Sequence, residues 1–234
     1  MTGREAPGAA GSRLALFDLD HTLIPFDSGM AWTRFLVAAG ALPADAEARY
    51  LDFCHQYVAG TLDIHAMHRA SMLPLRRIAP DRLQALRRDF EAEMRARLPV
   101  AMCELVASHR ERGDLCAIVT ATSRLVAEPF ARGFGVEHLV ATEAVLEDGL
   151  PTGEIDGLPC FREHKVTRVS AWLGPRRLAD FAQSWFYSDS SSDLPLLQAV
   201  SHPVAVQPDP RLKAHALASG WPVLDADARS TAPG

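Results

Sequence analysis

The sequence predicts an α/β protein with a doubly wound, mostly parallel sheet and an all-helical module inserted after the first strand. Over residues 99–225, short apolar segments alternate with amphipathic segments of helical period. This alternation indicates a parallel sheet that helices cover on both faces. Before it, about 75 residues of helical pattern follow the first apolar segment, whereas a crossover between parallel strands needs only one helix. The excess indicates an inserted module.

The pattern divides the chain into a core, an insertion and two tails. The helical insertion occupies residues 25–98, so the α/β core consists of residues 13–24 and 99–225. Residues 1–12 and 226–234 are interpreted as loose tails, and the first of them lacks the apolar region of a signal peptide.

Four helices are predicted in the insertion from the residues that start and stop helices. Pro43, Thr61 and Pro80 provide start signals, and Gly40 and Gly60 provide stop signals. The predicted helices span residues 28–40, 43–60, 61–73 and 79–98.

The core is predicted to alternate strands with helices. The predicted strands span residues 13–18, 114–120, 137–142, 184–189 and 203–207. The predicted helices span residues 100–113, 123–135, 162–174, 193–200 and 209–220. The stretch "AVLEDGLPTGEIDG" at 144–157 predicts a β-hairpin with Gly149 and Gly153 at its bend.

The composition favours a small-molecule partner. The 234 residues are 48% hydrophobic, carry a net charge of −5 and have a pI near 6.0, so they indicate no basic surface for nucleic acid. No run of about 18 apolar residues suggests a membrane partner. The sequence gives no sign of its oligomeric state. The widely spaced cysteines are expected to be reduced, buried thiols of a cytoplasmic protein: Cys54, Cys103, Cys116 and Cys160.

Two carboxylates follow the first predicted strand in the stretch "FDLDHTL". Because side chains alternate between the two faces of a strand, Asp18 and Asp20 project in the same direction. They lie at the carboxyl end of the strand, where open α/β sheets bind ligands. Carboxylates this close repel each other unless one is protonated or a cation lies between them, and a hard cation such as Mg²⁺ prefers oxygen ligands.

Thr120 ends another predicted strand, and a helix is predicted to start near Ser123. The Thr120 hydroxyl and the backbone amides of Ala121 and Thr122 would then lie at a helix N-terminus, which suits a phosphate group. In the alternative interpretation, Thr120 and Ser123 only cap the helix.

Lys165 falls within the apolar arc of its predicted helix. It either lays its stem along the core or brings its ammonium group to a site at the start of the helix. Asp189 ends a predicted strand, and Asp193 follows at a position that could also cap the next helix. We therefore expect three strand ends to place polar side chains at one edge of the sheet.

Four segments resemble, in chain order, the four motifs of the haloacid dehalogenase superfamily: "FDLDHTL", Thr120 at its strand end, Lys165, and "SDSSSDLPLL". The inserted helices resemble the cap of the phosphoserine-phosphatase-like branch, and the chain is similar to bacterial histidinol-phosphate and phosphoserine phosphatases. The resemblance covers residues 13–225 and implies a Rossmann-like core with a helical cap.

The resemblance implies an aspartyl-phosphate mechanism. Asp18 would be the nucleophile that attacks phosphorus. Asp20 would protonate the leaving alcohol and then activate the water that hydrolyses the intermediate. Thr120, the Ala121 amide and Lys165 would bind the phosphate oxygens.

The resemblance also implies the ligands of a Mg²⁺ ion. These are the carboxylates of Asp18 and Asp189 and the backbone carbonyl of Asp20, with Asp193 supporting the water ligands. Charge counting agrees with the acid role of Asp20. The four carboxylates carry −4, whereas Mg²⁺ and Lys165 carry +3, so protonating Asp20 makes the site neutral toward a phosphate dianion.

Specificity is expected to come from the inserted helices and from residues near the motifs. Asp27 resembles in position a substrate-binding glutamate of phosphoserine phosphatases, so we expect it to contact a substrate ammonium or hydroxyl group; alternatively it caps a helix with Ser28. Arg124 either adds charge near the substrate or is a solvated surface side chain. Ser123 and Ser192 stand where this branch commonly carries asparagine.

The resemblance thus implies a Mg²⁺-dependent phosphomonoesterase for a small metabolite of the histidinol phosphate or phosphoserine type. One alternative is a phosphotransferase or phosphomutase of the same superfamily, which passes the phosphoryl group to an alcohol. The other is a catalytically idle relative that binds phosphorylated ligands. Asp20 argues against idleness, because pure binding has no use for a second acid.

Overall fold

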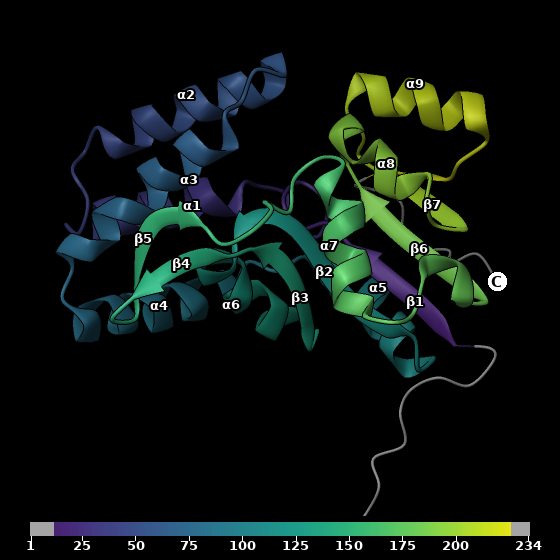
Figure 1. Ribbon diagram of the computed structural model, residues 1–234, viewed down its shortest axis with the longest axis horizontal. Coiled ribbons are helices and arrows are strands. Elements are labelled where there is room, and N and C mark those ends of the chain that lie inside the picture. The colour runs from purple at the N-terminus through teal and green to yellow at the C-terminus, as the bar shows by residue number, and fades with distance from the viewer. Residues whose placement is uncertain (1–11, 226–234) are drawn as a thin grey trace, which may run out of the picture.

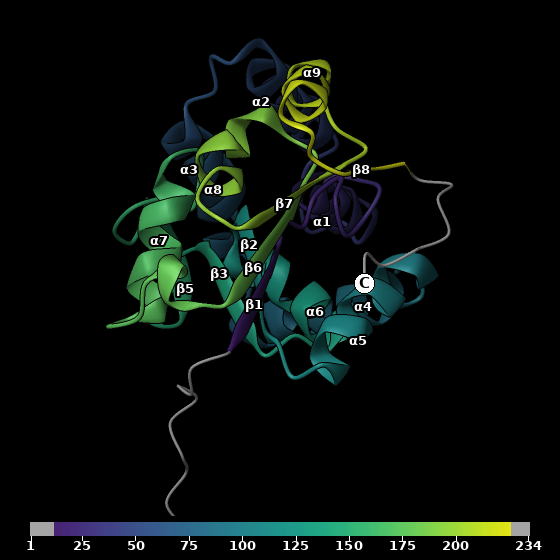
Figure 2. The ribbon, with the colours of Figure 1, turned by 90° about the vertical axis from the view of Figure 1, so that its right-hand side faces the viewer.

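Six parallel strands form the centre of the protein. The computed structural model describes residues 12–225, and its main sheet has the strand order β3-β2-β1-β6-β7-β8, with all neighbours parallel (Figure 1, Figure 2). The strands are β1 (Arg13–Phe17), β2 (Leu115–Ser123), β3 (His138–Thr142), β6 (Gln183–Ser188), β7 (His202–Val206) and β8 (Val223–Leu224). This topology confirms the predicted fold class. Apart from Ser12, the predicted tails lie outside the described residues.

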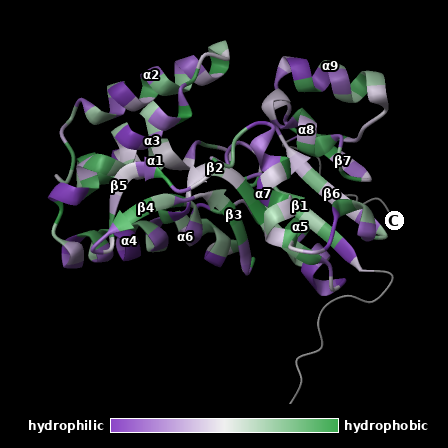
Figure 3. Cartoon of the chain, in the orientation of Figure 1, coloured by the Kyte–Doolittle hydropathy of each residue, from purple (hydrophilic) through white to green (hydrophobic). Residues whose placement is uncertain are grey.

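Helices cover both faces of the sheet, and apolar residues line the strands beneath them (Figure 3). The core helices are α5 (Val100–Glu111), α6 (Arg124–Phe134), α7 (His164–Leu173), α8 (Leu194–Leu197) and α9 (Pro210–Ser219). Along β1, Leu14 and Leu16 pack with α7, α8 and α9. Ala15 and Phe17 face α5 and α6. Both faces are covered, which explains why the strands are continuous hydrophobic runs in the sequence. Within residues 12–225, no helix has the length and hydropathy needed to cross a membrane.

The inserted segment folds into helices that share the core of the sheet. They are α1 (Ser28–Ala38), α2 (Ala46–Ala59), α3 (Ile64–Met72), the 3₁₀ turn η1 (Leu73–Arg77) and α4 (Pro80–Arg95). The Trp32 ring of α1 meets Phe90 of α4 edge to face at 5.0 Å, and Phe90 meets Phe130 of α6 at 5.9 Å. These side chains belong to one hydrophobic cluster with the sheet. The division into a core and a separate cap at residues 25–98 stays a prediction.

Some helix ends in the insertion follow the expected signals, and others do not. Pro80 begins α4, and Gly60 ends α2 with a φ of 75°. By contrast, α3 begins after Asp63 rather than at Thr61, because the Asp63 carboxylate accepts two hydrogen bonds from backbone amides of the first turn. Helix α2 begins three residues after Pro43, so the start predicted for this helix was also wrong.

Strands β4 (Ala144–Glu147) and β5 (Leu150–Ile155) form the predicted hairpin. Its bend lies at Asp148 and Gly149, which have positive φ values of 51° and 76°. Gly153 is not in the bend, contrary to the prediction. It lies within β5, where a Cβ atom would come within 3.2 Å of η1. Arg69 of α3 binds Glu154 of β5 at 2.7 Å, so this ion pair joins the hairpin to the inserted helices.

Three smaller features also differ from the prediction. The helix expected at 193–200 consists of the 3₁₀ turn η3 (Ser191–Asp193) followed by α8. The two-residue strand β8 was not predicted, because two residues show no periodicity. All four cysteines are free, but Cys54 and Cys103 are half-buried rather than buried, since both lie on partly exposed helices.

A buried hydrogen-bond network ties α5 to the sheet. The His109 ring is 1% exposed, with Nδ1 2.8 Å from Asp114 Oδ2 and Nε2 2.8 Å from the Tyr187 hydroxyl. Arg13 binds the other carboxylate oxygen of Asp114 at 2.5 Å. Burial lowers the pKa of His109, against a hydrogen bond with Asp114 that raises it. The folded protein therefore resists protonation of this ring.

We expect His109 to make stability depend on pH. A histidine in the unfolded chain titrates near about 6.5, whereas the pKa of His109 in the folded protein is lower. Acidification below about pH 6.5 therefore protonates the unfolded chain first and lowers the free energy of unfolding. His109→Gln should lower that free energy by about 2 kcal/mol at neutral pH and flatten the pH slope. Urea unfolding at several pH values measures both effects, and parallel pH profiles would contradict this assignment.

Candidate active site

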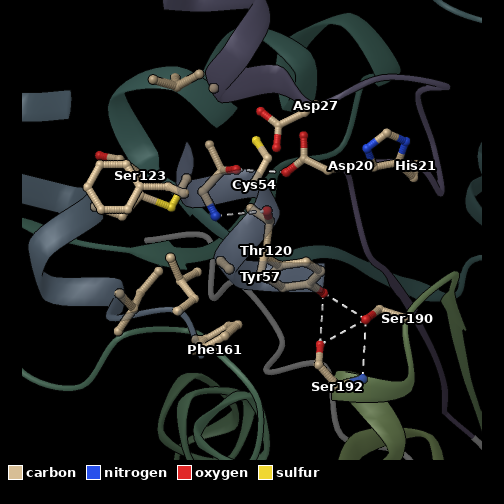
Figure 4. A pocket seen from close by; sticks show the side chains of 18 of the residues that line it. Asp20, His21, Asp27, Cys54, Tyr57, Thr120, Ser123, Phe161, Ser190 and Ser192 are labelled. Carbon is tan, nitrogen blue, oxygen red and sulfur yellow. Dashed lines mark hydrogen bonds between the residues drawn. The ribbon is translucent and has the colours of Figure 1, made fainter. Parts of the chain in front are cut away.

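A cavity of about 340 Å³ lies between the carboxyl ends of the strands and the inserted helices. The loops after β1 and β6 and the last residues of β2 line one side, and α1, α2 and α3 line the other. Figure 4 shows Asp20, Thr120, Cys54 and Tyr57 among the residues that line the cavity. The cavity brings together these sequence-predicted residues: Asp18, Asp20, Asp27, Thr120, Ala121, Lys165, Asp189 and Asp193.

The ammonium group of Lys165 bridges two buried carboxylates. Nζ lies 2.8 Å from Asp18 Oδ1 and 2.6 Å from Asp193 Oδ2. The Ser188 hydroxyl donates a hydrogen bond to the same Asp193 oxygen at 2.8 Å. Lys165 is 3% exposed in the first turn of α7, so it brings its charge into the site and does not snorkel. Likewise, the Asp193 side chain makes no capping hydrogen bond to α8.

Thr22 links Asp18 to Asp189. Its Oγ1 lies 3.4 Å from Asp18 Oδ2 and 3.2 Å from Asp189 Oδ1, and it accepts a hydrogen bond from the Asp189 amide at 3.0 Å. Two carboxylates from different strand ends therefore converge on one hydroxyl group. No role was predicted for Thr22, although its place four residues after Asp18 in "FDLDHTL" was the available signal.

Asp20 is held by donors on both of its oxygens. Oδ1 accepts a hydrogen bond from the Ser28 amide at 2.6 Å, and Oδ2 accepts one from the Thr122 hydroxyl at 2.7 Å. The Ser28 amide belongs to the first turn of α1, where backbone N–H groups favour a negative charge. The Thr122 amide in turn donates to Thr120 Oγ1 at 3.1 Å. The end of β2 is thereby tied to the loop after β1.

Burial and like charges raise the pKa values of two carboxyl groups in the site. Burial raises the pKa of Asp18 to about 7, although the Lys165 charge opposes the shift. Burial, with repulsion from Asp18 and Asp193, raises the pKa of Asp189 to about 8. Burial by itself would lower the pKa of Lys165, but the two carboxylates outweigh it and raise that pKa well above its ordinary value. Negative charge is thus in excess here.

The arrangement of Asp18 and Asp189 fits a hard divalent cation. One oxygen of each carboxylate lies within 3.4 Å of the Thr22 hydroxyl. Asp20 lies between Asp18 and Thr22 in the loop after β1. No three His, Cys, Asp or Glu side chains form a ready metal site within residues 12–225. The predicted set does not require three side chains, because two carboxylates, a backbone carbonyl and water are ligands that suit Mg²⁺.

Asp27 caps α1 and also lines the cavity. Its Oδ1 accepts hydrogen bonds from the Met30 amide at 2.6 Å and from the Tyr50 hydroxyl at 3.0 Å. Ser28, the predicted partner in capping, instead directs its hydroxyl to the end of β2. Burial and the nearby Asp20 charge raise the pKa of Asp27 to about 6.

The structure does not bring Arg124 to the cavity. Its Nε lies 2.8 Å from Glu143 Oε1, and its guanidinium also binds the Leu139 carbonyl at 2.6 Å. This corrects the expected substrate contact, because Glu143 neutralises the charge that a substrate would need. Ser123 does line the cavity, but it makes no capping bond to α6. The buried Ser123 Oγ has no hydrogen-bond partner among the described residues.

Three hydroxyl groups join α2 to the loop after β6, and we refer to them as the hydroxyl triangle. Tyr57 Oη lies 2.7 Å from Ser190 Oγ and 3.0 Å from Ser192 Oγ, and the two serine oxygens are 3.0 Å apart (Figure 4). This contact of Ser192 was not predicted, since in the sequence Ser192 stands out only as a departure from a family pattern. Its short side chain here lets Tyr57 approach the loop that carries Asp189 and Asp193.

Comparisons with known proteins agree with this geometry. Residues 15–198 match the family model for haloacid dehalogenase-like hydrolases. The chain is 38% identical to a histidinol-phosphatase of Neisseria meningitidis over 217 residues, which cover 91% of this chain and 98% of that protein.

Solved structures show the same fold. A Bordetella pertussis protein of unknown function is 45% identical with a TM-score of 0.85, covering 92% of this chain and 99% of that one. A phosphoserine phosphatase determined as a phospho-aspartyl intermediate analogue superposes with a TM-score of 0.62 at 16% identity, covering 94% and 95% of the two chains. The motifs, the topology and these matches together show that the chain is an enzyme of the haloacid dehalogenase-like hydrolase family.

Proposed function

We propose that the protein is a Mg²⁺-dependent phosphomonoesterase that hydrolyses a small phosphorylated metabolite through an aspartyl-phosphate. The observation that carries this proposal is the buried contact of Lys165 with Asp18 and Asp193, beside Asp20 and Asp189. The histidinol-phosphatase relative supports the same reaction class, since its likeness extends over 91% of the chain.

Asp18 is the nucleophile of the proposed reaction. One carboxylate oxygen forms a bond to phosphorus while the bond from phosphorus to the leaving alcohol breaks. Lys165 at 2.8 Å holds the carboxylate in place and stabilises negative charge on the phosphoryl oxygens. Thr120 and Ala121 line the cavity, and the hydroxyl of the first and the amide of the second are the proposed donors to the same oxygens.

Asp20 is the proposed general acid and base. It donates a proton to the leaving oxygen and later accepts one from the water that attacks the aspartyl-phosphate. The Ser28 amide and the Thr122 hydroxyl fix its orientation at 2.6 and 2.7 Å. The 2.7 Å contact also suits protonated Asp20, which would then donate to the threonine oxygen.

The carboxylates of Asp18 and Asp189 and the carbonyl of Asp20 are the proposed ligands of Mg²⁺, and Asp193 supports its water ligands. When bound, the ion offsets the excess negative charge and polarises the phosphoryl group. Thr22 orients both carboxylates for this purpose.

The proposed substrate is of the histidinol phosphate or phosphoserine type. A cavity of about 340 Å³ accommodates a small metabolite, and Asp27 within it offers a carboxylate to a substrate ammonium group. The cytoplasmic location expected from the cysteines remains part of this proposal.

Replacing the nucleophile tests the mechanism directly. Asp18→Asn should lower kcat for p-nitrophenyl phosphate by about 10³-fold or more, because the neutral amide cannot form the phosphoenzyme. Release of p-nitrophenol in the presence of Mg²⁺ measures this loss, and circular dichroism checks that the variant is folded. A folded variant with substantial residual turnover would refute the nucleophile assignment.

Removing divalent cations should abolish activity. Without the ion, four carboxylates face one lysine, and their excess charge repels a phosphate dianion. Dialysis against EDTA should therefore stop the hydrolysis of p-nitrophenyl phosphate, and added Mg²⁺ should restore it. Full activity of the protein after chelation would rule out metal dependence.

Asp20→Asn should affect alkyl and aryl esters differently. An alkyl alcohol leaves poorly without a proton, so hydrolysis of an alkyl phosphate should fall by about 10²- to 10⁴-fold. p-Nitrophenolate needs no acid, so its release should become a burst followed by slow turnover, as the aspartyl-phosphate lacks its base. Rapid-mix kinetics with both esters tests this, and equal losses without a burst would count against the role of Asp20.

A further inference from the structure

Tyr50 and Asp27 form a fixed pair at the boundary between α1 and α2. Tyr50 is 7% exposed, and its hydroxyl donates to Asp27 Oδ1 at 3.0 Å. The same oxygen accepts the capping bond from the Met30 amide at 2.6 Å. Both described hydrogen bonds of the carboxylate thus go to Oδ1. Oδ2 of Asp27 thus has no hydrogen bond among the described residues, and both Asp27 and Tyr50 line the cavity.

The tyrosine reaches Asp27 because position 29 is a glycine. A Cβ atom on Gly29 would lie 2.0 Å from the Tyr50 hydroxyl oxygen and 2.7 Å from the ring carbon that bears it. The backbone of α1 and the phenol are therefore in direct contact. Since Gly29 has no positive φ value, close approach is the reason for a glycine inside this helix.

The charges around the cavity favour a ligand that carries an ammonium group and no carboxylate group. Among the described residues that line the cavity there is no arginine. Its one lysine, Lys165, is already bound by two carboxylates. Burial lowers the pKa of His68, which favours its neutral form. The exposed His21 lies beside Asp20 and Asp27. The negative charges of these two aspartates would repel a substrate carboxylate there.

We propose that Tyr50 is a positioning residue that holds Asp27 for a substrate ammonium group, and that the enzyme selects phosphate esters of amino alcohols over those of amino acids. This inference rests on the proposed phosphatase function. It adds the residue that orients the amine-binding carboxylate and the chemical class of the leaving group.

Three small phosphate esters test the effects of a substrate ammonium group and of a substrate carboxylate group separately. Propyl phosphate and 2-aminoethyl phosphate have similar shapes and differ in the ammonium group, and O-phosphoserine adds a carboxylate to the latter. We define amine discrimination as the ratio of kcat/KM for 2-aminoethyl phosphate to that for propyl phosphate. A ratio of this kind does not depend on the folded fraction of a variant.

Tyr50→Phe should lower the amine discrimination about tenfold, mainly through KM for 2-aminoethyl phosphate, because one charge-orienting hydrogen bond is lost. Gly29→Ala should lower it as well, since the added methyl group displaces the same hydroxyl. Tyr187→Phe is the matched control: it removes a buried hydroxyl that binds His109, away from the cavity, and should keep the wild-type ratio.

In the wild-type protein, KM for O-phosphoserine should exceed that for 2-aminoethyl phosphate by about tenfold or more. An unchanged ratio in Tyr50→Phe would overturn the role of Tyr50, and preference for O-phosphoserine would overturn the proposed substrate class. Failure of the wild-type protein to hydrolyse p-nitrophenyl phosphate with Mg²⁺ would overturn the proposed function and this inference with it.

Discussion

The buried contact of Lys165 with Asp18 and Asp193 is the interaction on which the site depends. A buried ammonium group is strongly destabilising unless carboxylates surround it. Its two partners follow different strands, β1 and β6, and the lysine itself lies on α7. The contact can form only if β1 and β6 are neighbours in parallel register, as the pairing of Phe17 with Tyr187 establishes. The contact of Lys165 with Asp18 and Asp193 therefore depends on this order of the strands.

The inserted helices orient residues that the strand ends supply. The first turn of α1 holds Asp20 through the Ser28 amide, only eight residues along the chain. Helix α2 orients Asp27 through Tyr50 and touches the loop after β6 through Tyr57. An insertion directly after the first strand thus connects Asp20, Asp27 and the loop that carries Asp189. The insertion also shares a hydrophobic core with α6.

Much of the fold and of the site could be predicted because local patterns encode them. Apolar runs mark the strands, and strand ends of a parallel sheet meet at one edge, so Asp18, Thr120 and Asp189 were expected near one another. Side-chain contacts between distant segments leave no such pattern. Tyr57 meets Ser190 across 133 residues, and Thr22 meets Asp189 across 167. The pairing of Arg124 with Glu143 was hidden for the same reason, although 19 residues separate them.

Besides the shared hydrophobic core, hydrogen bonds between neutral groups and ion pairs fasten the insertion to the rest of the protein. On one side, the hydroxyl triangle consists of neutral groups. On the other, Arg69–Glu154 and Arg76–Glu147 are largely exposed ion pairs between the inserted helices and the β4–β5 hairpin. Dissolved salt screens exposed charges but leaves neutral hydrogen bonds almost untouched. Concentrated electrolyte therefore weakens the ion pairs to the β4–β5 hairpin but not the hydrogen bonds of the hydroxyl triangle.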